Sequence, residues 1–263
     1  MVSQRSNGLP GETENAGYLE PLWLSPQPGL ELSTDEVHLW RAFLDQSPEQ
    51  ISGLGQTLSD EERARAGRFH FERDRRRFVV GRGVLRAILG QYLGLEATQA
   101  RFSFGPYGKP YLAEEPGDCK LCFNLAHSSE IALYAFSLRR QVGVDVEQLR
   151  FLADAEQVAE HFFSPGEKAV WDSLPPAHRQ AAFYDCWTRK EAYIKATGKG
   201  LSERLELIEV SLTPGEPAQV LSVAGDHHEA LRWSLASLTP APGYVAALAV
   251  EGHGWQLRCW QYG

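Results

Sequence analysis

Two carboxylates stand two positions apart in the segment VGVDVEQ, at Asp145 and Glu147. Side chains alternate between the two faces of a strand, so Val142, Val144 and Val146 would share one face and both carboxylates the other. The two acidic Cα atoms would then be roughly 7 Å apart, which lets both side chains reach one hard cation such as Mg²⁺ or Mn²⁺. An amphipathic strand with a solvated acidic face would show the same pattern.

A carboxylate and an ammonium are four residues apart in YDCWTRKEAYIKATGKG, at Glu191 and Lys195. Residues at this spacing are neighbours on one face of a helix. The carboxylate could bind a metal ion while the ammonium steadies a phosphate. A surface ion pair that stabilises the helix is the alternative, and Trp187, one turn earlier, argues against it because a solvated face seldom carries Trp.

Two further polar residues fall where turns are expected. FNLAHSS leaves His127 at a turn between two strands, and YGKP leaves Lys109 at a Gly/Pro turn. Turns often display ligand-binding groups. A histidine in a turn also commonly makes only local hydrogen bonds, so a phosphate contact at His127 has a plain structural alternative.

A run of arginines precedes these motifs, at Arg73, Arg75, Arg76, Arg77, Arg82 and Arg86. The run could grip phosphates or nucleic acid. Because Glu72 and Asp74 interrupt it, a solvated helix face with internal ion pairs is favoured for most of these arginines.

The four cysteines, at 119, 122, 186 and 259, are too few and too unevenly spaced for a disulfide framework, which indicates reduced thiols. Cys119 and Cys122 form a CxxC that could be a redox pair or half of a zinc site. The residues after it read as a strand and turn, not as a helix that would lower a thiol pKa, and no second pair supplies two more zinc ligands. We expect cysteines without a chemical role.

The elements that would position these residues form helix-and-strand blocks. A helix is expected over 33–44 with Ser33 or Thr34 as its N-cap, and a long helix ends around 90–94 with Phe78, Leu85 and Ile88 on its buried face. A second helical region spans 154–196, with breaks at 164–165 and 175–176. Short strands are expected over 19–26, 101–112, 121–137, 142–149, 205–212, 218–224, 229–238, 244–250 and 255–262. The similar halves hint weakly at a duplicated α+β unit.

Composition limits the classes of function. A chain of 263 residues, 43% hydrophobic and 23% charged, can form one large or two small cores. Its net charge of −8 argues against a surface that seeks nucleic acid or anionic lipid as a whole. Residues 1–20 read as a loose polar tail, and no later stretch reaches the roughly 18 to 20 apolar residues of a membrane span, so we expect a cytoplasmic protein.

The order and wording of the motifs resemble the Sfp-type phosphopantetheinyl transferases from about Leu22 onward. The matching strings are YGKP at 107–110, FNLAHS at 123–128, GVDVE at 143–147, FFS at 162–164 and WTRKEAYIKATGKGLS at 187–202. The last string, with its W-x-x-KEA-x-x-K core, is the most diagnostic of the family.

This resemblance implies an α+β pseudo-dimer of two similar halves, 21–140 and 141–263, with the active site in the cleft between them. It implies a monomeric enzyme that transfers 4′-phosphopantetheine from coenzyme A to a serine of acyl or peptidyl carrier proteins, with Mg²⁺ or Mn²⁺. The implied metal ligands are Asp145, Glu147 and Glu191, and the implied catalytic residues are Glu191 and Lys195. The implied coenzyme A contacts are Arg65, Arg77, Lys109, Asn124, His127, Asp145 and Lys195.

Two departures from the family pattern affect the nucleotide contacts. Ala126 stands where many relatives have serine, so a hydroxyl contact is expected to be missing. Glu62 stands where some relatives have lysine near the adenine. A metal-dependent phosphohydrolase, with water in place of the carrier serine, and a non-enzymatic module that binds an acidic partner through the arginine helix remain the alternative functions.

Overall fold

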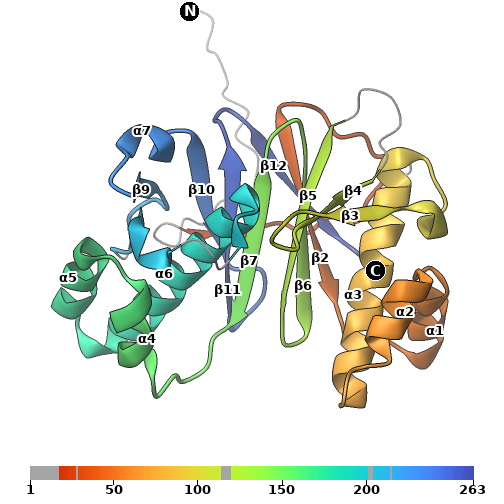
Figure 1. Cartoon of the computed structure of the whole chain (residues 1–263), viewed down its shortest axis with the longest axis horizontal. Coiled ribbons are helices and arrows are strands. Elements are labelled where there is room, and N and C mark those ends of the chain that lie inside the picture. Colours follow the sequence, from red (N-terminus) through yellow and green to blue (C-terminus); the bar gives the residue numbers. More distant parts are fainter. Residues whose placement is uncertain (1–17, 28, 114–119, 201–203, 214) are drawn as a thin grey trace, which may run out of the picture.

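The computed structural model describes residues 18–27, 29–113, 120–200, 204–213 and 215–263 (Figure 1). Two four-stranded sheets stand side by side in the middle of the molecule, and helices cover the outer side of each. The fold is therefore mixed α/β. Among the described residues, no helix combines the length and apolar character that a membrane span requires.

The first sheet has the strand order β12-β2-β6-β5. Its strands are β2 (Glu36–Phe43), β5 (Leu121–Ser128), β6 (Ile131–Leu138) and β12 (Gln256–Gln261). Its outer face is covered by α1 (Pro48–Gln56), α2 (Asp60–Ala66) and α3 (Glu72–Leu93). Leu85 and Ile88 of α3 are fully buried against Trp40 and Phe136 of the sheet, as the predicted helix periodicity requires.

The second sheet has the order β1-β10-β11-β7. Its strands are β1 (Tyr18–Leu19), β7 (Val142–Gln148), β10 (Trp233–Leu238) and β11 (Tyr244–Glu251). Its helices are α4 (Ala155–Phe162), α5 (Pro165–Ser173) and α6 (Pro176–Thr197). Helix α5 begins directly after Ser164, and α6 begins directly after Pro175. Each helix has a proline as its first residue, so the predicted breaks in the helical region are confirmed.

Smaller elements lie beside the sheets. The hairpin β3 (Phe102–Phe104) and β4 (Pro110–Leu112) follows η1 (Ala97–Gln99). The ribbon β8 (Ile208–Val210) and β9 (Val220–Val223) follows η3 (Leu205–Leu207), and the short helix α7 (His227–Ala230) precedes β10. The strand predicted over 229–238 thus begins only after α7.

The two sheets meet along their edge strands, β5 and β7. One buried cluster contains Val144 and Val146 of β7 together with Ala126 of β5. Asn124 of β5 accepts a hydrogen bond from the Val144 amide at 3.0 Å, so a side chain joins the two edges where no ladder is formed. The chain ends also exchange sheets, since β1 joins the second sheet and β12 the first.

Helix α6 packs directly on β7 at Gly143. A Cβ atom at this position would lie 2.1 Å from the main-chain oxygen of Ala192, so only glycine permits the approach. This contact sets α6 at a short distance from the acidic face of β7.

The helix predicted over 33–44 is wrong, because these residues include β2. Val37 and Leu39 face one buried cluster, whereas Trp40 and Ala42 face another. A strand that is buried on both faces lacks the alternation of apolar and polar residues that distinguishes a strand from a helix. Pairing with β6 and β12 therefore decided this element.

Candidate active site

A cavity of about 550 Å³ lies beside β7 and the C-terminal half of α6. It brings together residues from β5, β7, α4, α6 and η3. The lining residues are His127, Asp145, Glu147, Phe162, Trp187, Glu191, Lys195, Arg204, Leu205 and Glu206. Five side chains that the sequence pattern singled out as chemical groups therefore share one cavity, and Trp187 lies in its wall.

The acidic face of β7 is withdrawn from solvent. Asp145 is buried and Glu147 is partly buried, so a solvated acidic face does not describe this strand. Asp145 lies within the cavity wall, and Glu147 accepts a hydrogen bond of 2.9 Å from the Ser128 hydroxyl of β5. The same hydroxyl accepts from the Gln148 amide at 3.1 Å, which fixes the end of β7 against β5.

Glu191 and Lys195 lie one helical turn apart on α6, as their spacing predicted. The Lys195 ammonium is 2.5 Å from the Asp145 carboxylate of β7. This ion pair crosses from helix to strand. It is consequently part of the cavity and not a pair on the helix surface.

Burial raises the pKa of Asp145, Glu147 and Glu191, because it removes the water that would stabilise the ionised carboxylate. Lys195 opposes this effect at all three groups, while Asp145 raises the pKa of the other two further. One oxygen of Asp145 (Oδ2) and one of Glu191 (Oε1) are buried without a hydrogen-bond partner. The cavity wall thus holds negative oxygens that lack a donor.

These orphaned oxygens fit a hard divalent cation. Mg²⁺ and Mn²⁺ prefer carboxylate oxygens, and an unpartnered buried carboxylate oxygen is costly unless a cation or proton satisfies it. Across the described ranges, no three His, Cys, Asp or Glu side chains are grouped as a ready set of ligands. The Lys195 ammonium contacts Oδ1 of Asp145, so Oδ2 is the oxygen of this carboxylate that is left for a cation.

His127 is the seventh residue of β5, so its predicted place in a turn is wrong. The turn to β6 lies at Ser129, which has a φ of +50°, and Glu130. His127 reaches the rim of the cavity. Partial desolvation, with the positive charges of Lys195 and Arg77, lowers the pKa of His127.

The two arginines assigned to coenzyme A occupy different places. Arg77 of α3 makes two 2.8 Å hydrogen bonds to Asp45 and its charge acts on His127, which places it near the cavity rim. Arg65 of α2 is exposed, and its guanidinium lies 5.4 Å from the ring centre of Phe78. Neither arginine lines the cavity.

Lys109 and Asn124 make contacts within the protein. The Lys109 ammonium donates to main-chain oxygens of α6 and β7, and Asn124 is buried and bonded to the Val144 amide. The structure does not bring either side chain to the cavity wall.

Glu62 and Ala126, the two departures from the family pattern, are both placed in the fold. Glu62 completes a capping box with Ser59 at the start of α2 and lies 2.7 Å from the buried Arg86. Ala126 is buried between the sheets.

The exposed arginines Arg75 and Arg76 pair with Glu72 on α3, which confirms internal ion pairs for this part of the helix.

Lys190 is a residue whose role the sequence did not reveal. Its ammonium is buried, 2.5 Å from Glu167 and 2.7 and 3.0 Å from the main-chain oxygens of Phe162 and Leu205. Both of those residues line the cavity. Lys190 therefore holds two parts of the cavity wall together. Its position beside Glu191 in the KEA motif was the available signal, but its partners are distant in sequence.

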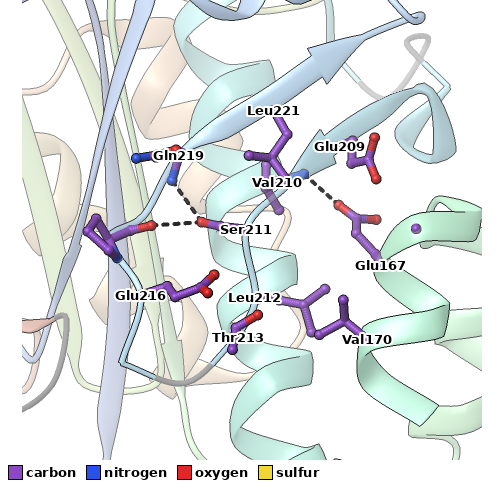
Figure 2. Close-up of a pocket in the computed structure, with 12 residues that line it drawn as sticks. Glu167, Val170, Glu209, Val210, Ser211, Leu212, Thr213, Glu216, Gln219 and Leu221 are labelled. Atoms are coloured by element: carbon purple, nitrogen blue, oxygen red, sulfur yellow. Dashed lines mark hydrogen bonds between the residues drawn. The ribbon is translucent and has the colours of Figure 1, made fainter. Parts of the chain in front are cut away.

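A second cavity, of about 520 Å³, lies between α5 and the β8–β9 ribbon (Figure 2). Glu167 at its side accepts a hydrogen bond from the Val210 amide at 2.8 Å and also pairs with Lys190. Ser211 accepts from the Gln219 amide at 2.9 Å. Glu167 and Ser211 thus make their polar contacts within the protein.

Three of the four cysteines lie within the described residues. Cys119 lies outside the described residues, so the CxxC motif is not tested. Cys186 and Cys259 are free, buried thiols. Burial raises the pKa of Cys186, and raises that of Cys259 to about 12, which disfavours the reactive thiolate.

Two family models match this chain. Residues 141–249 match the family described as the 4′-phosphopantetheinyl transferase superfamily, and residues 43–138 match the family described as 4′-phosphopantetheinyl transferase, N-terminal. The chain is 48% identical to the 4′-phosphopantetheinyl transferase HetI of Nostoc sp. over 93% of this chain and 100% of that protein. It is 34% identical to a putative 4′-phosphopantetheinyl transferase of Synechocystis sp. over 71% of this chain and 74% of that protein.

The chain is also 30% identical to the 4′-phosphopantetheinyl transferase Sfp of Bacillus subtilis, over 67% of this chain and 77% of that protein. These relatives carry transferase names and give no support to a phosphohydrolase. The match with HetI spans nearly the whole chain. The residues that line the cavity all lie within the two segments that the family models match. The chain therefore belongs to the 4′-phosphopantetheinyl transferase superfamily.

Proposed function

We propose that this protein transfers the 4′-phosphopantetheine group of coenzyme A to a serine of an acyl or peptidyl carrier protein and releases 3′,5′-ADP. The observation that carries the proposal is the cavity in which Asp145, Glu191 and Lys195 meet, in a chain of this family. Oxygen ligands for a cation and an ammonium for a phosphate are the groups that transfer from a pyrophosphate requires.

Asp145, Glu147 and Glu191 would hold a divalent ion, Mg²⁺ or Mn²⁺. Their raised pKa values and the orphaned oxygens of Asp145 and Glu191 support this role, because a cation would satisfy both. A bound ion would neutralise pyrophosphate charge and make the β-phosphorus more electrophilic.

Glu191 would act on the attacking serine of the carrier, and Lys195 would act on the leaving group. Glu191 accepts the proton of the carrier serine, directly or through water, as the serine oxygen bonds to the β-phosphorus. The bond from that phosphorus to the bridging oxygen of the pyrophosphate breaks, and Lys195 stabilises the charge of the departing 3′,5′-ADP. For this step the ammonium must turn from Asp145 toward the substrate.

His127 and Arg77 would contact the phosphates of coenzyme A at the rim of the cavity. His127 lines that rim, and the charge of Arg77 acts on it. A phosphate would raise the pKa of His127 and favour its charged form. The exposed Arg65 remains a proposed contact for the outer part of the nucleotide.

The proposal also includes the arrangement of the chain as two similar halves with the active site between them. Two four-stranded sheets, each with helices on its outer side, support a pseudo-dimer of two α+β halves divided near residue 140. The cavity takes His127 from the first sheet and Asp145 from the second, which supports an active site between the halves. A single chain would then suffice for activity.

Mass spectrometry of carrier proteins tests the reaction. The protein is incubated with coenzyme A, Mg²⁺ and a panel of apo acyl and peptidyl carriers, and each carrier is weighed. We expect one added phosphopantetheine group and an equal amount of 3′,5′-ADP. Release of 3′,5′-ADP without a carrier would favour the phosphohydrolase, and no reaction with any carrier would contradict the proposal.

A further inference from the structure

The Lys109 side chain leaves the β3–β4 hairpin and ends among oxygen atoms of the opposite half. Its ammonium lies 2.7 Å from the Ala196 carbonyl, 3.4 Å from the Val142 carbonyl and 3.3 Å from the Gln141 side-chain oxygen. An ammonium has three N–H donors, and these three oxygens match that number.

The two carbonyls belong to the elements that form the candidate active site. Ala196 lies in the last turn of α6, where main-chain carbonyls have no partner within the helix and carry the negative end of its dipole. Val142 is the first residue of β7. One positive charge therefore joins the end of α6 to the start of β7.

The surrounding surface is shaped for this side chain. Gly198 follows α6 with a φ of +70°. A Cβ atom at this position would lie only 3.1 Å from the Lys109 side chain, so the glycine leaves room for that side chain. Tyr107 packs in the same way against Gly200. The YGKP hairpin thus fits the GKG turn, although about ninety positions separate them in the sequence.

We propose that Lys109 is a positioning residue, which holds α6 and β7 in the arrangement that brings Glu191 and Lys195 to Asp145, and does not bind the phosphates of coenzyme A. This role rests on the proposed function. Glu191 and Lys195 stand on α6 and Asp145 stands on β7, so a shift between these elements would separate the groups that act together.

Burial supports this assignment. It lowers the pKa of Lys109 to about 8, because few water molecules solvate its charge. An ammonium placed to receive a phosphate would have to leave three oxygens of the protein first. The contacts seen here instead satisfy the buried charge within the fold.

The test compares Lys109→Met with Lys109→Arg and with the matched control Lys120→Met, an exposed lysine of the same half. Calorimetry measures coenzyme A binding without a carrier, steady-state kinetics measures transfer, and hydrogen exchange measures the amides of α6 and β7. For Lys109→Met we expect a coenzyme A Kd within about twofold of the original, a kcat lower by about 10- to 100-fold, and faster exchange at the end of α6.

Lys109→Arg keeps the charge and should recover part of kcat, and Lys120→Met should change none of the three measurements. A Kd raised tenfold or more with unchanged exchange would make Lys109 a phosphate ligand and overturn the proposal. Faster exchange with an unchanged kcat would also overturn it, because the contact would then serve stability alone. If the original protein modified no carrier, the proposed function would fail, while calorimetry and exchange would still decide between a phosphate ligand and a link between α6 and β7.

Discussion

Replacing Lys190 by methionine should destabilise the protein strongly. The change removes the ammonium from the buried Glu167, 2.5 Å away, and from the main-chain oxygens of Phe162 and Leu205. Both side chains of the ion pair are at most 2% exposed. Breaking a buried pair on one side costs about 3–5 kcal/mol, since the remaining charge stays without compensation.

The cost should depend on pH. Burial raises the pKa of Glu167 in the folded protein, and Lys190 lowers it again. Without Lys190 the folded-state pKa rises further above the unfolded value. The loss of stability is then largest above that raised pKa, and it shrinks as the pH falls and Glu167 binds a proton.

Urea unfolding followed by circular dichroism measures this loss at pH 7.5 and pH 5. The matched control is Lys190→Met combined with Glu167→Gln, which keeps an acceptor for the Val210 amide and removes the uncompensated charge. We expect the double variant to be more stable than Lys190→Met alone. A loss below about 1 kcal/mol in the single variant, or no recovery in the double one, would refute this account of the buried pair.

Four further substitutions test which residues bind the metal ion, coenzyme A and the carrier. Asp145→Ala or Glu191→Ala should nearly abolish transfer with the fold retained by circular dichroism, and near-normal rates in saturating Mg²⁺ would contradict the metal assignment. His127→Ala should remove a charged phosphate contact of about 1.5–3 kcal/mol, which raises the coenzyme A Kd by about ten- to a hundred-fold in calorimetry with little effect on the carrier KM. Lys199→Glu, on the turn after α6, should raise the KM for acidic carriers and reduce its salt dependence; a larger effect on coenzyme A would count against carrier docking there.

The sequence predicted the elements whose pattern is local. The alternation of VGVDVEQ placed Asp145 and Glu147 on one face of a strand, and that strand is β7. Prolines and glycines marked the ends of α5 and α6, because these residues change the backbone within a few positions. The motif order also indicated the family, since its residues are adjacent in the chain.

Only the tertiary structure decided the partners of these residues. Strand β2 was predicted as a helix because its burial on both faces comes from distant elements. Lys195 pairs with Asp145 across fifty positions. The partners of Lys190 lie 15 to 28 positions away, and the oxygens that Lys109 contacts lie 32 to 87 positions away. Contacts of this kind depend on the distance between two groups in space, which local spacing does not determine. The sequence could therefore identify the chemical groups of the cavity, while the packing of α6 on β7 determined which of them meet.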